Sequence, residues 1–141
     1  MKKIDPDSVV YDLHEYGINF DAREIYLHKY IHTESETADD TGVDYRMSVG
    51  FVKNLRLLDQ QNHKPITICM QSCGGSWNHG MAIYDAIVAC KSPTTIVAYA
   101  HARSMTSVIL QAADKRLLAP NCDVVIHHGW LGFNEDRSWW R

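Results

Sequence analysis

The chain has 141 residues, of which 45% are hydrophobic and 22% charged, and its formal net charge is −3. This length suffices for one folded domain with its own core, and the composition is far from that of a disordered chain. The small negative charge and the lack of a Lys/Arg-rich run argue against a nucleic acid or an anionic membrane as partner.

The N-terminus favours an intracellular protein, and the cysteines favour free thiols. Residues 1–7 turn polar and acidic where a signal peptide would begin its apolar stretch, and no apolar run reaches membrane-spanning length. We expect a cytoplasmic protein with a single domain over residues 1–141, without a cofactor or a metal. The cysteines follow no zinc-ribbon or thioredoxin spacing, so we expect free, buried thiols at Cys69, Cys73, Cys90 and Cys122.

The first half of the chain predicts one strand, one acidic loop and one long helix. β-branched and aromatic residues at 23–27 predict a short strand after an N-terminal segment over residues 1–22. Residues 33–44 are acidic with no basic residue, which predicts a solvated loop insertion; a calcium loop is the alternative, although the carboxylates lack EF-hand spacing. A helix over 46–61 is predicted from apolar residues at helical spacing, namely Met47, Phe51, Leu55 and Leu58.

The second half alternates between short apolar runs and helical patterns. This alternation implies a parallel sheet with right-handed crossovers. The predicted elements are a buried strand at 66–70, a helix at 78–90, a strand at 94–100, a helix at 104–113 and short strands near 117 and at 124–126.

Two adjacent glycines, Gly74 and Gly75, separate the strand at 66–70 from the following helix. Without side chains, such a turn lets a carbonyl group approach the backbone closely, and its N–H groups can stabilise negative charge as an oxyanion hole. A plain tight turn is the alternative. A phosphate loop is disfavoured because the Lys-Ser/Thr ending is missing.

Ser104 is expected at the start of a helix that follows an apolar strand. The partial positive charge of a helix N-terminus favours an oxyanion, so this position suits a nucleophile. Capping of the helix is the commoner role of such a serine, and the Gly-x-Ser-x-Gly elbow is absent from the sequence. The local sequence leaves both roles open.

His127 follows the apolar run 124–126, from which an imidazole could take a proton from a serine on a neighbouring element. Its neighbour His128 also suggests zinc, but no third ligand recurs at a convincing spacing. A structural histidine is a further alternative.

Taken in order, six segments resemble the ClpP family of serine peptidases, which has the crotonase-like fold. The similarity extends from about Arg23 to His128. The matching segments are Arg23–Leu27, like the first strand of the family; Gly74–Ser76, like its Gly-Gly turn; Ala82–Asp85, like its Ile-Tyr-Asp; Ser104-Met105, like its nucleophile pair; Leu118–Asn121, like its Leu-Pro-Asn; and Val125–His127, like the stretch that ends in its catalytic histidine.

This resemblance implies an α/β, crotonase-like (ClpP-type) fold of repeated β-β-α units with a parallel sheet, shortened at the C-terminus. It implies an ATP-dependent-type serine endopeptidase with Ser104 as nucleophile, His127 as general base, and the N–H groups of Gly75 and Met105 as oxyanion hole. Enzymes of the family form rings that receive unfolded polypeptide from an AAA+ ATPase unfoldase. A homo-oligomeric ring, polypeptide substrates and such an ATPase partner are therefore implied.

The chain departs from the family pattern at three points. The third triad member of the family is an Asp beyond the histidine segment, and its position here is unknown, because Asp136 is too near to be assumed. Arg103 stands where the family has a small residue and Thr106 where it has glycine, which predicts altered access for the substrate.

These departures keep other functions open. A non-catalytic ClpP-like ring subunit would explain the missing acid, and the acidic insertion is compatible with a phage head-maturation protease. An acyl-CoA enzyme of the same fold is disfavoured, because the Ser104 and His127 matches are peptidase features.

Overall fold

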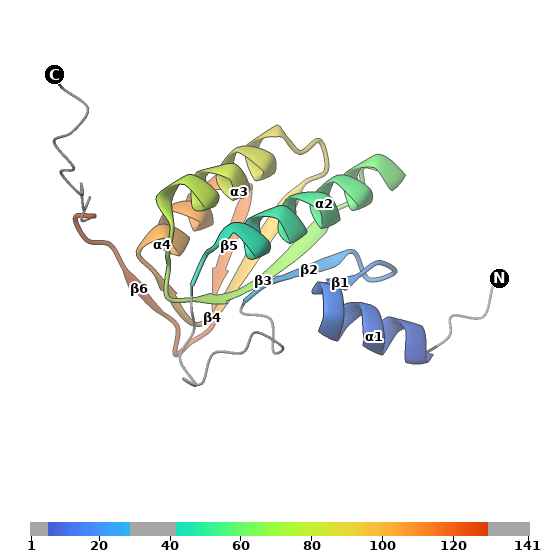
Figure 1. Cartoon of the computed structure of the whole chain (residues 1–141), viewed down its shortest axis with the longest axis horizontal. Helices are drawn as coiled ribbons and strands as arrows, with labels where there is room; N and C mark the ends of the chain where they lie inside the picture. The colour runs from blue at the N-terminus through green and yellow to red at the C-terminus, as the bar shows by residue number, and fades with distance from the viewer. Residues whose placement is uncertain (1–5, 29–41, 130–141) are drawn as a thin grey trace, which may run out of the picture.

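A six-stranded, largely parallel sheet organises the computed structural model, which describes residues 6–28 and 42–129. The strands follow the order β1-β2-β3-β4-β5, with β6 also paired to β4. Helices α2 and α3 lie over one face of the sheet, and α1 lies beside β1, at the opposite end of the molecule from β6 (Figure 1). The strands are β1 (Ile18–Asn19), β2 (Glu24–Leu27), β3 (Ile66–Ser72), β4 (Thr94–Arg103), β5 (Lys115–Leu118) and β6 (Asp123–Val125). The helices are α1 (Pro6–Tyr16), α2 (Tyr45–Gln61), α3 (Trp77–Ala89), α4 (Met105–Ile109) and the 3-10 turn η1 (Leu110–Ala112).

The α/β fold class is confirmed, and some details differ from the predictions. The segment 1–22 contains α1 and the short β1, which pairs antiparallel with β2. No residue of α1 is buried, so this helix adds no residue to the core. The helix predicted over 104–113 ends at Ile109 and continues only as a 3-10 turn. Most of the predicted acidic loop lies outside the described residues; its last residue, Asp44, precedes α2 and caps it by accepting a hydrogen bond from the Met47 N–H at 2.8 Å.

The core forms where α2 and α3 pack on the central strands. Alternate residues of β3 are buried, as expected for a strand with helices on one face. The predicted apolar stripe of α2 is confirmed, because all four of its residues are buried. The large apolar residues buried in β3, α2 and α3 are Ile66, Ile68, Met70, Met47, Phe51, Leu55, Leu58, Ile83 and Ile87.

A bend in β4 divides its outer edge between two partner strands. Residues 95–98 pair with β5, residues 101–103 pair with β6, and Ala100 between them has a positive φ of 51°. The strand predicted at 94–100 therefore continues to Arg103. This extension brings the chain after β6 alongside the end of β4.

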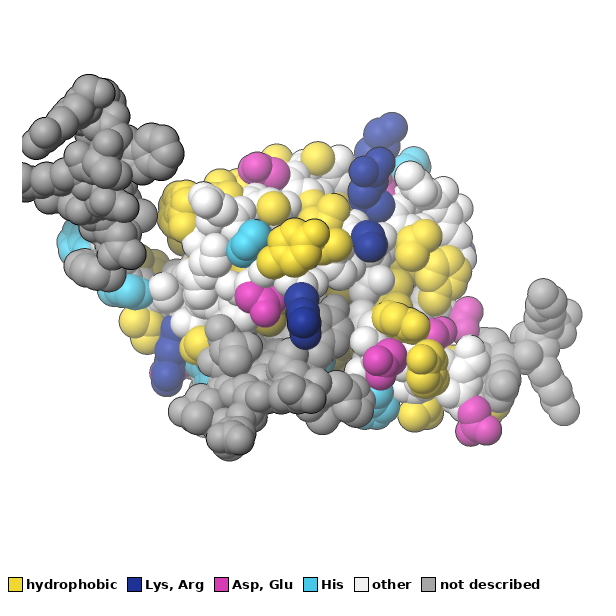
Figure 2. Space-filling model, viewed as in Figure 1, with side chains coloured by type: hydrophobic (Ala, Val, Ile, Leu, Met, Phe, Trp, Pro, Cys, Tyr) yellow, Lys and Arg dark blue, Asp and Glu magenta, His cyan; other side chains and the backbone are white. Residues whose placement is uncertain are grey.

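The surface mixes apolar and charged side chains. On the face that Figure 2 shows, Lys and Arg side chains are interspersed with acidic and hydrophobic ones. Within residues 6–28 and 42–129, no helix combines the length and apolar character needed to cross a bilayer. Cys69, Cys90 and Cys122 are partly buried, and desolvation raises the pKa of each thiol. The expectation of a buried thiol is wrong for Cys73, which is exposed because it lies in the turn before Gly74.

Asp59 ties the last turns of α2 to the loop before β4. Its Oδ1 accepts hydrogen bonds from the backbone N–H and the hydroxyl of Ser92, both at 2.8 Å, and Oδ2 accepts one from the Lys91 N–H at 3.3 Å. Desolvation opposes ionisation of this carboxyl, but the hydrogen bonds outweigh it and hold the pKa of Asp59 well below its usual range. The ionised form therefore stabilises the fold.

Replacing Asp59 with asparagine should lower the free energy of unfolding by about 1–3 kcal/mol at pH 7, because charge-assisted hydrogen bonds are lost. Because the pKa is lower in the folded state, this contribution is present above the unfolded pKa of about 4 and is lost as the pH falls below it. Urea unfolding of both proteins at several pH values measures the difference. Asp85→Asn is the matched control, since Asp85 is exposed on the neighbouring α3. A difference that stayed constant down to pH 3 would contradict this account.

Candidate active site

The structure brings Ser104 and His127 together. Ser104 lies between β4 and α4, and its hydroxyl oxygen is 2.8 Å from His127 Nε2. The backbone between them is also joined, because the Ser104 N–H donates to the Val125 carbonyl at 2.8 Å, at the end of β6. Two residues that are 23 positions apart thus form a hydroxyl–imidazole pair, the arrangement that an activated serine needs.

Ser104 has an unusual backbone conformation. Its φ of 52° and ψ of −123° lie outside the regions that non-glycine residues normally occupy. Its side chain makes no capping hydrogen bond to α4, so the capping role that the sequence left open is not what this hydroxyl does. The turn instead directs the hydroxyl toward His127.

The Gly74-Gly75 turn packs against Ser104. The φ values of the two glycines are 105° and 136°, a range that L-residues rarely adopt. A Cβ atom at Gly74 would lie 2.5 Å from Ser104 Cβ and 2.7 Å from the Arg103 carbonyl oxygen. The turn therefore requires glycine for both its conformation and its closeness to Ser104.

The backbone N–H groups of Gly75 and Met105 lie on either side of the contact between the Gly-Gly turn and Ser104. The Val43 N–H donates to the Gly74 carbonyl at 2.5 Å, and the Ser76 N–H donates to the Val43 carbonyl at 2.8 Å. This bridge does not use the N–H of Gly75. Met105 is the first residue of α4, where a helical N–H has no acceptor within the helix. Both groups can thus donate to a ligand beside Ser104.

Arg103 and Thr106 both make structural contacts, and the altered substrate access expected from them stays a prediction. Neither is among the described residues that line the pocket at Ser104. The Thr106 hydroxyl is buried and lies 2.8 Å from the Ser72 carbonyl and 2.7 Å from the Arg103 carbonyl, so it joins the end of β3 to the turn at Ser104. The Arg103 guanidinium forms an ion pair with Asp123.

The pocket at Ser104 has a volume of about 760 Å³ and mostly apolar walls. Trp77 and Ile126 are large apolar residues of this wall that were not predicted as site residues, and their exposed fractions are 59% and 80%. Trp77 follows Ser76 and Ile126 precedes His127 in the sequence, and this proximity could have indicated that both residues lie at the site. The other lining residues are Gly75, Ser76, Ser104, Met105, Ser107, Val108, His127 and Gly129.

The third member of a triad is not found in the described part of the chain. Within residues 6–28 and 42–129, the hydrogen bond recorded for the His127 ring is the one to Ser104. Asp136 lies outside the described residues.

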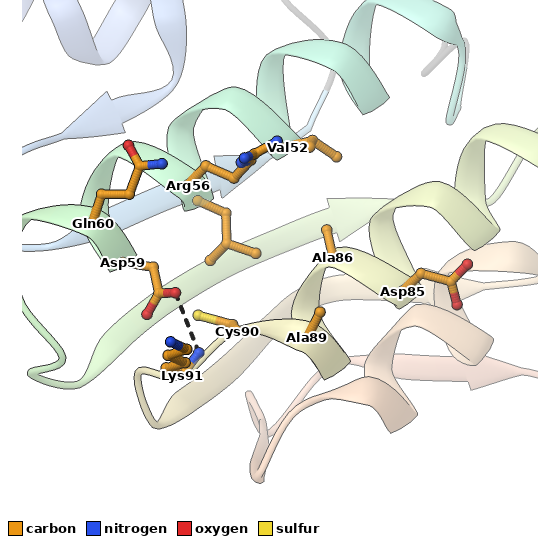
Figure 3. Close-up of a pocket in the computed structure, with 10 residues that line it drawn as sticks. Val52, Arg56, Asp59, Gln60, Asp85, Ala86, Ala89, Cys90 and Lys91 are labelled. Atoms are coloured by element: carbon orange, nitrogen blue, oxygen red, sulfur yellow. Dashed lines mark hydrogen bonds between the residues drawn. The ribbon is translucent and has the colours of Figure 1, made fainter.

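A second pocket of about 570 Å³ lies between α2 and α3 (Figure 3). Apolar side chains such as Val52 and Ala86 share its wall with charged ones, and the Asp59–Lys91 hydrogen bond lies at its rim. Neither Ser104 nor His127 lines it, so it is separate from the hydroxyl–imidazole pair.

Comparison with known sequences identifies the family. The sequence profile of the Clp protease family matches residues 21–138, which include both glycines, Ser104 and His127. The chain belongs to the Clp protease family. The resemblance to ClpP-like serine peptidases is thereby confirmed.

Relatives of this Clp protease chain are proteolytic subunits. It is 38% identical over 96 residues to the ATP-dependent Clp protease proteolytic subunit of Deinococcus radiodurans, an alignment that covers 66% of this chain and 47% of that protein. It is 34% identical over 98 residues to the corresponding subunit of Carsonella ruddii, with 68% and 50% covered. The Clp protease chain thus spans about half the length of the curated relatives it matches.

Solved structures give the same fold. The ClpP protease catalytic domain from Plasmodium falciparum superposes on this Clp protease chain with a TM-score of 0.69 at 29% identity, covering 92% of this chain and 63% of that one. ClpP1 from Listeria monocytogenes gives a TM-score of 0.66 at 25% identity, covering 77% and 58%. The ClpP-type fold expected from the sequence is therefore confirmed.

Proposed function

We propose that this chain is a subunit of a serine endopeptidase that cleaves unfolded polypeptides. The observation that carries the proposal is the 2.8 Å contact between Ser104 Oγ and His127 Nε2, beside the Gly-Gly turn of a Clp protease fold. Such a contact is what general-base activation of a serine requires.

In this mechanism, Ser104 Oγ attacks the carbonyl carbon of the scissile peptide, and His127 Nε2 takes the hydroxyl proton. The N–H groups of Gly75 and Met105 stabilise the oxyanion of the tetrahedral intermediate. When the C–N bond breaks, His127 returns the proton to the leaving amine, and an acyl-enzyme remains. Water then attacks the ester with His127 again as base, which releases the acid and restores Ser104.

The pocket supports a preference for apolar side chains next to the cleaved bond. Its wall includes Trp77, Met105, Val108 and Ile126, which offer apolar surface within the same cavity as Ser104. Apolar segments are accessible in unfolded polypeptides and buried in folded ones, which fits the proposed substrate class.

Assembly follows from the family as a further proposal. Curated relatives are named as subunits of an ATP-dependent protease, which supports an oligomeric ring and an AAA+ ATPase unfoldase as partner. A cytoplasmic location stays a prediction from the sequence.

Labelling with a fluorophosphonate tests the nucleophile without a known substrate. We expect one covalent adduct by intact mass in the wild-type chain and none in Ser104→Ala, because the probe reacts with an activated serine. Ser76→Ala is the matched control: Ser76 lines the same pocket and its side chain makes no capping hydrogen bond. It should keep the adduct.

The outcome separates the two leading functions. An adduct lost only in Ser104→Ala would support the peptidase. A wild-type chain that forms no adduct would contradict it and favour the non-catalytic ring subunit.

A further inference from the structure

His127 follows β6, a strand whose residues are not packed into the core. β6 has three residues, all exposed, and within residues 6–28 and 42–129 it pairs only with β4. Ile126, which precedes His127, is also exposed. Apolar packing therefore contributes little to the position of the imidazole, and polar contacts between β4 and β6 must supply much of it.

The Arg103–Asp123 ion pair is a side-chain contact that joins these two strands. Arg103 Nε donates to both carboxylate oxygens of Asp123, at 3.0 and 3.1 Å, and Nη2 donates to Oδ2 at 2.5 Å. A guanidinium that engages a carboxylate in this way fixes orientation as well as distance. The hydrogen bonds from Arg103 also hold the pKa of Asp123 below its usual value, so the carboxylate stays ionised near neutral pH.

The position of this pair in the ladder links it to both candidate catalytic residues. Arg103 directly precedes Ser104, and Asp123 begins the strand that leads to His127. Arg103 is opposite Val125 and Asp123 is opposite His101, so the ion pair crosses the ladder diagonally. It therefore opposes both separation and sliding of β6 along β4, the two movements that would change the Ser104–His127 distance.

We propose that the Arg103–Asp123 ion pair is a positioning clamp that holds His127 within hydrogen-bond reach of Ser104. The inference rests on the proposed function, in which that contact activates the serine. Both side chains are 47% exposed, so the pair adds little to global stability, and its effect is on the geometry of the site.

The test is a double-mutant cycle on the rate of fluorophosphonate labelling of Ser104. We expect Arg103→Gln and Asp123→Asn each to slow labelling by roughly two- to five-fold, the range for an exposed ion pair, and the double variant to be no slower than either. The charge swap, Arg103→Asp with Asp123→Arg, should recover part of the rate. Thermal unfolding should change little in all of them. Lys115→Gln is the matched control, since Lys115 is an exposed cation on β5, the other neighbour of β4 on this edge.

The dependence of the labelling rate on salt concentration is a second test of the same ion pair. Because exposed charges are screened, added salt should slow wild-type labelling toward the rate of the double variant, which should itself respond little. Single variants that label at the wild-type rate would overturn the proposal. The proposal would also be overturned if the two substitutions slowed labelling additively in the double variant. The same holds if the loss of labelling rate accompanied a large drop in unfolding temperature.

A measurement independent of reactivity separates this proposal from the proposed function. The Ser104 N–H donates to the Val125 carbonyl across the same ladder, so its hydrogen exchange reports on whether β6 stays on β4. We expect faster exchange in Arg103→Gln than in the wild type, whether or not Ser104 reacts with the probe. Equal exchange rates of the Ser104 N–H in the two proteins would contradict the proposed positioning role. If the wild type does not react with the probe but exchange is faster in the variant, only the proposed peptidase function is contradicted.

Discussion

His127→Ala should lower the rate of fluorophosphonate labelling of Ser104 by about 10²–10⁴-fold, because the hydroxyl would lose the base that takes its proton. The structure places the hydroxyl and His127 Nε2 at 2.8 Å, within the distance for direct proton transfer. The measurement is the second-order rate constant for adduct formation at neutral pH.

His128 provides the matched control for this experiment. It is the adjacent histidine, is exposed, and is not among the described residues that line the pocket. His128→Ala should label at close to the wild-type rate. If both variants lost reactivity equally, a general effect on the end of β6 would replace the specific role of His127.

Arg23→Met should destabilise the fold by about 3–5 kcal/mol, because a buried guanidinium with many acceptors would be lost. Arg23 lies just before β2 and is 8% exposed. Its acceptors lie around the end of α2 and the loops that follow: the carbonyls of Leu58, Asn62, Lys64 and Pro65, and the side chains of Gln61 and Ser92, at 2.9 to 3.3 Å.

Without Arg23, the carbonyls of Lys64 and Pro65 would lose their donor in a partly buried place, whereas those of Leu58 and Asn62 would still accept from the Asn62 N–H and the Ser92 hydroxyl. Urea unfolding measures the loss. Arg56→Met is the matched control, since Arg56 is an exposed arginine on α2; it should change the free energy of unfolding by less than about 0.5 kcal/mol. A loss of similar size in both variants would show that charge, and not the hydrogen-bond network, is responsible.

The contacts of Arg23 are also an example of a feature of the fold that cannot be predicted from the sequence. The apolar periodicities of β3 and α2 predict these elements, because each buries one side against the other. The role of Arg23 depends on carbonyls that lie 35 or more residues away along the chain, which no local pattern contains.

For the site, the sequence by itself determined which residues have the right chemistry: a serine after an apolar strand, a histidine after another, and a Gly-Gly turn. These signals are local, since each depends on the residue type and on the element next to it. Only the tertiary structure decided that Ser104 and His127 meet, because their contact depends on the pairing of β6 with the last residues of β4. It also decided that Arg103 pairs with Asp123 and that Thr106 joins the turn at Ser104 to β3, since these contacts depend on how β4 is aligned with β6 and with β3.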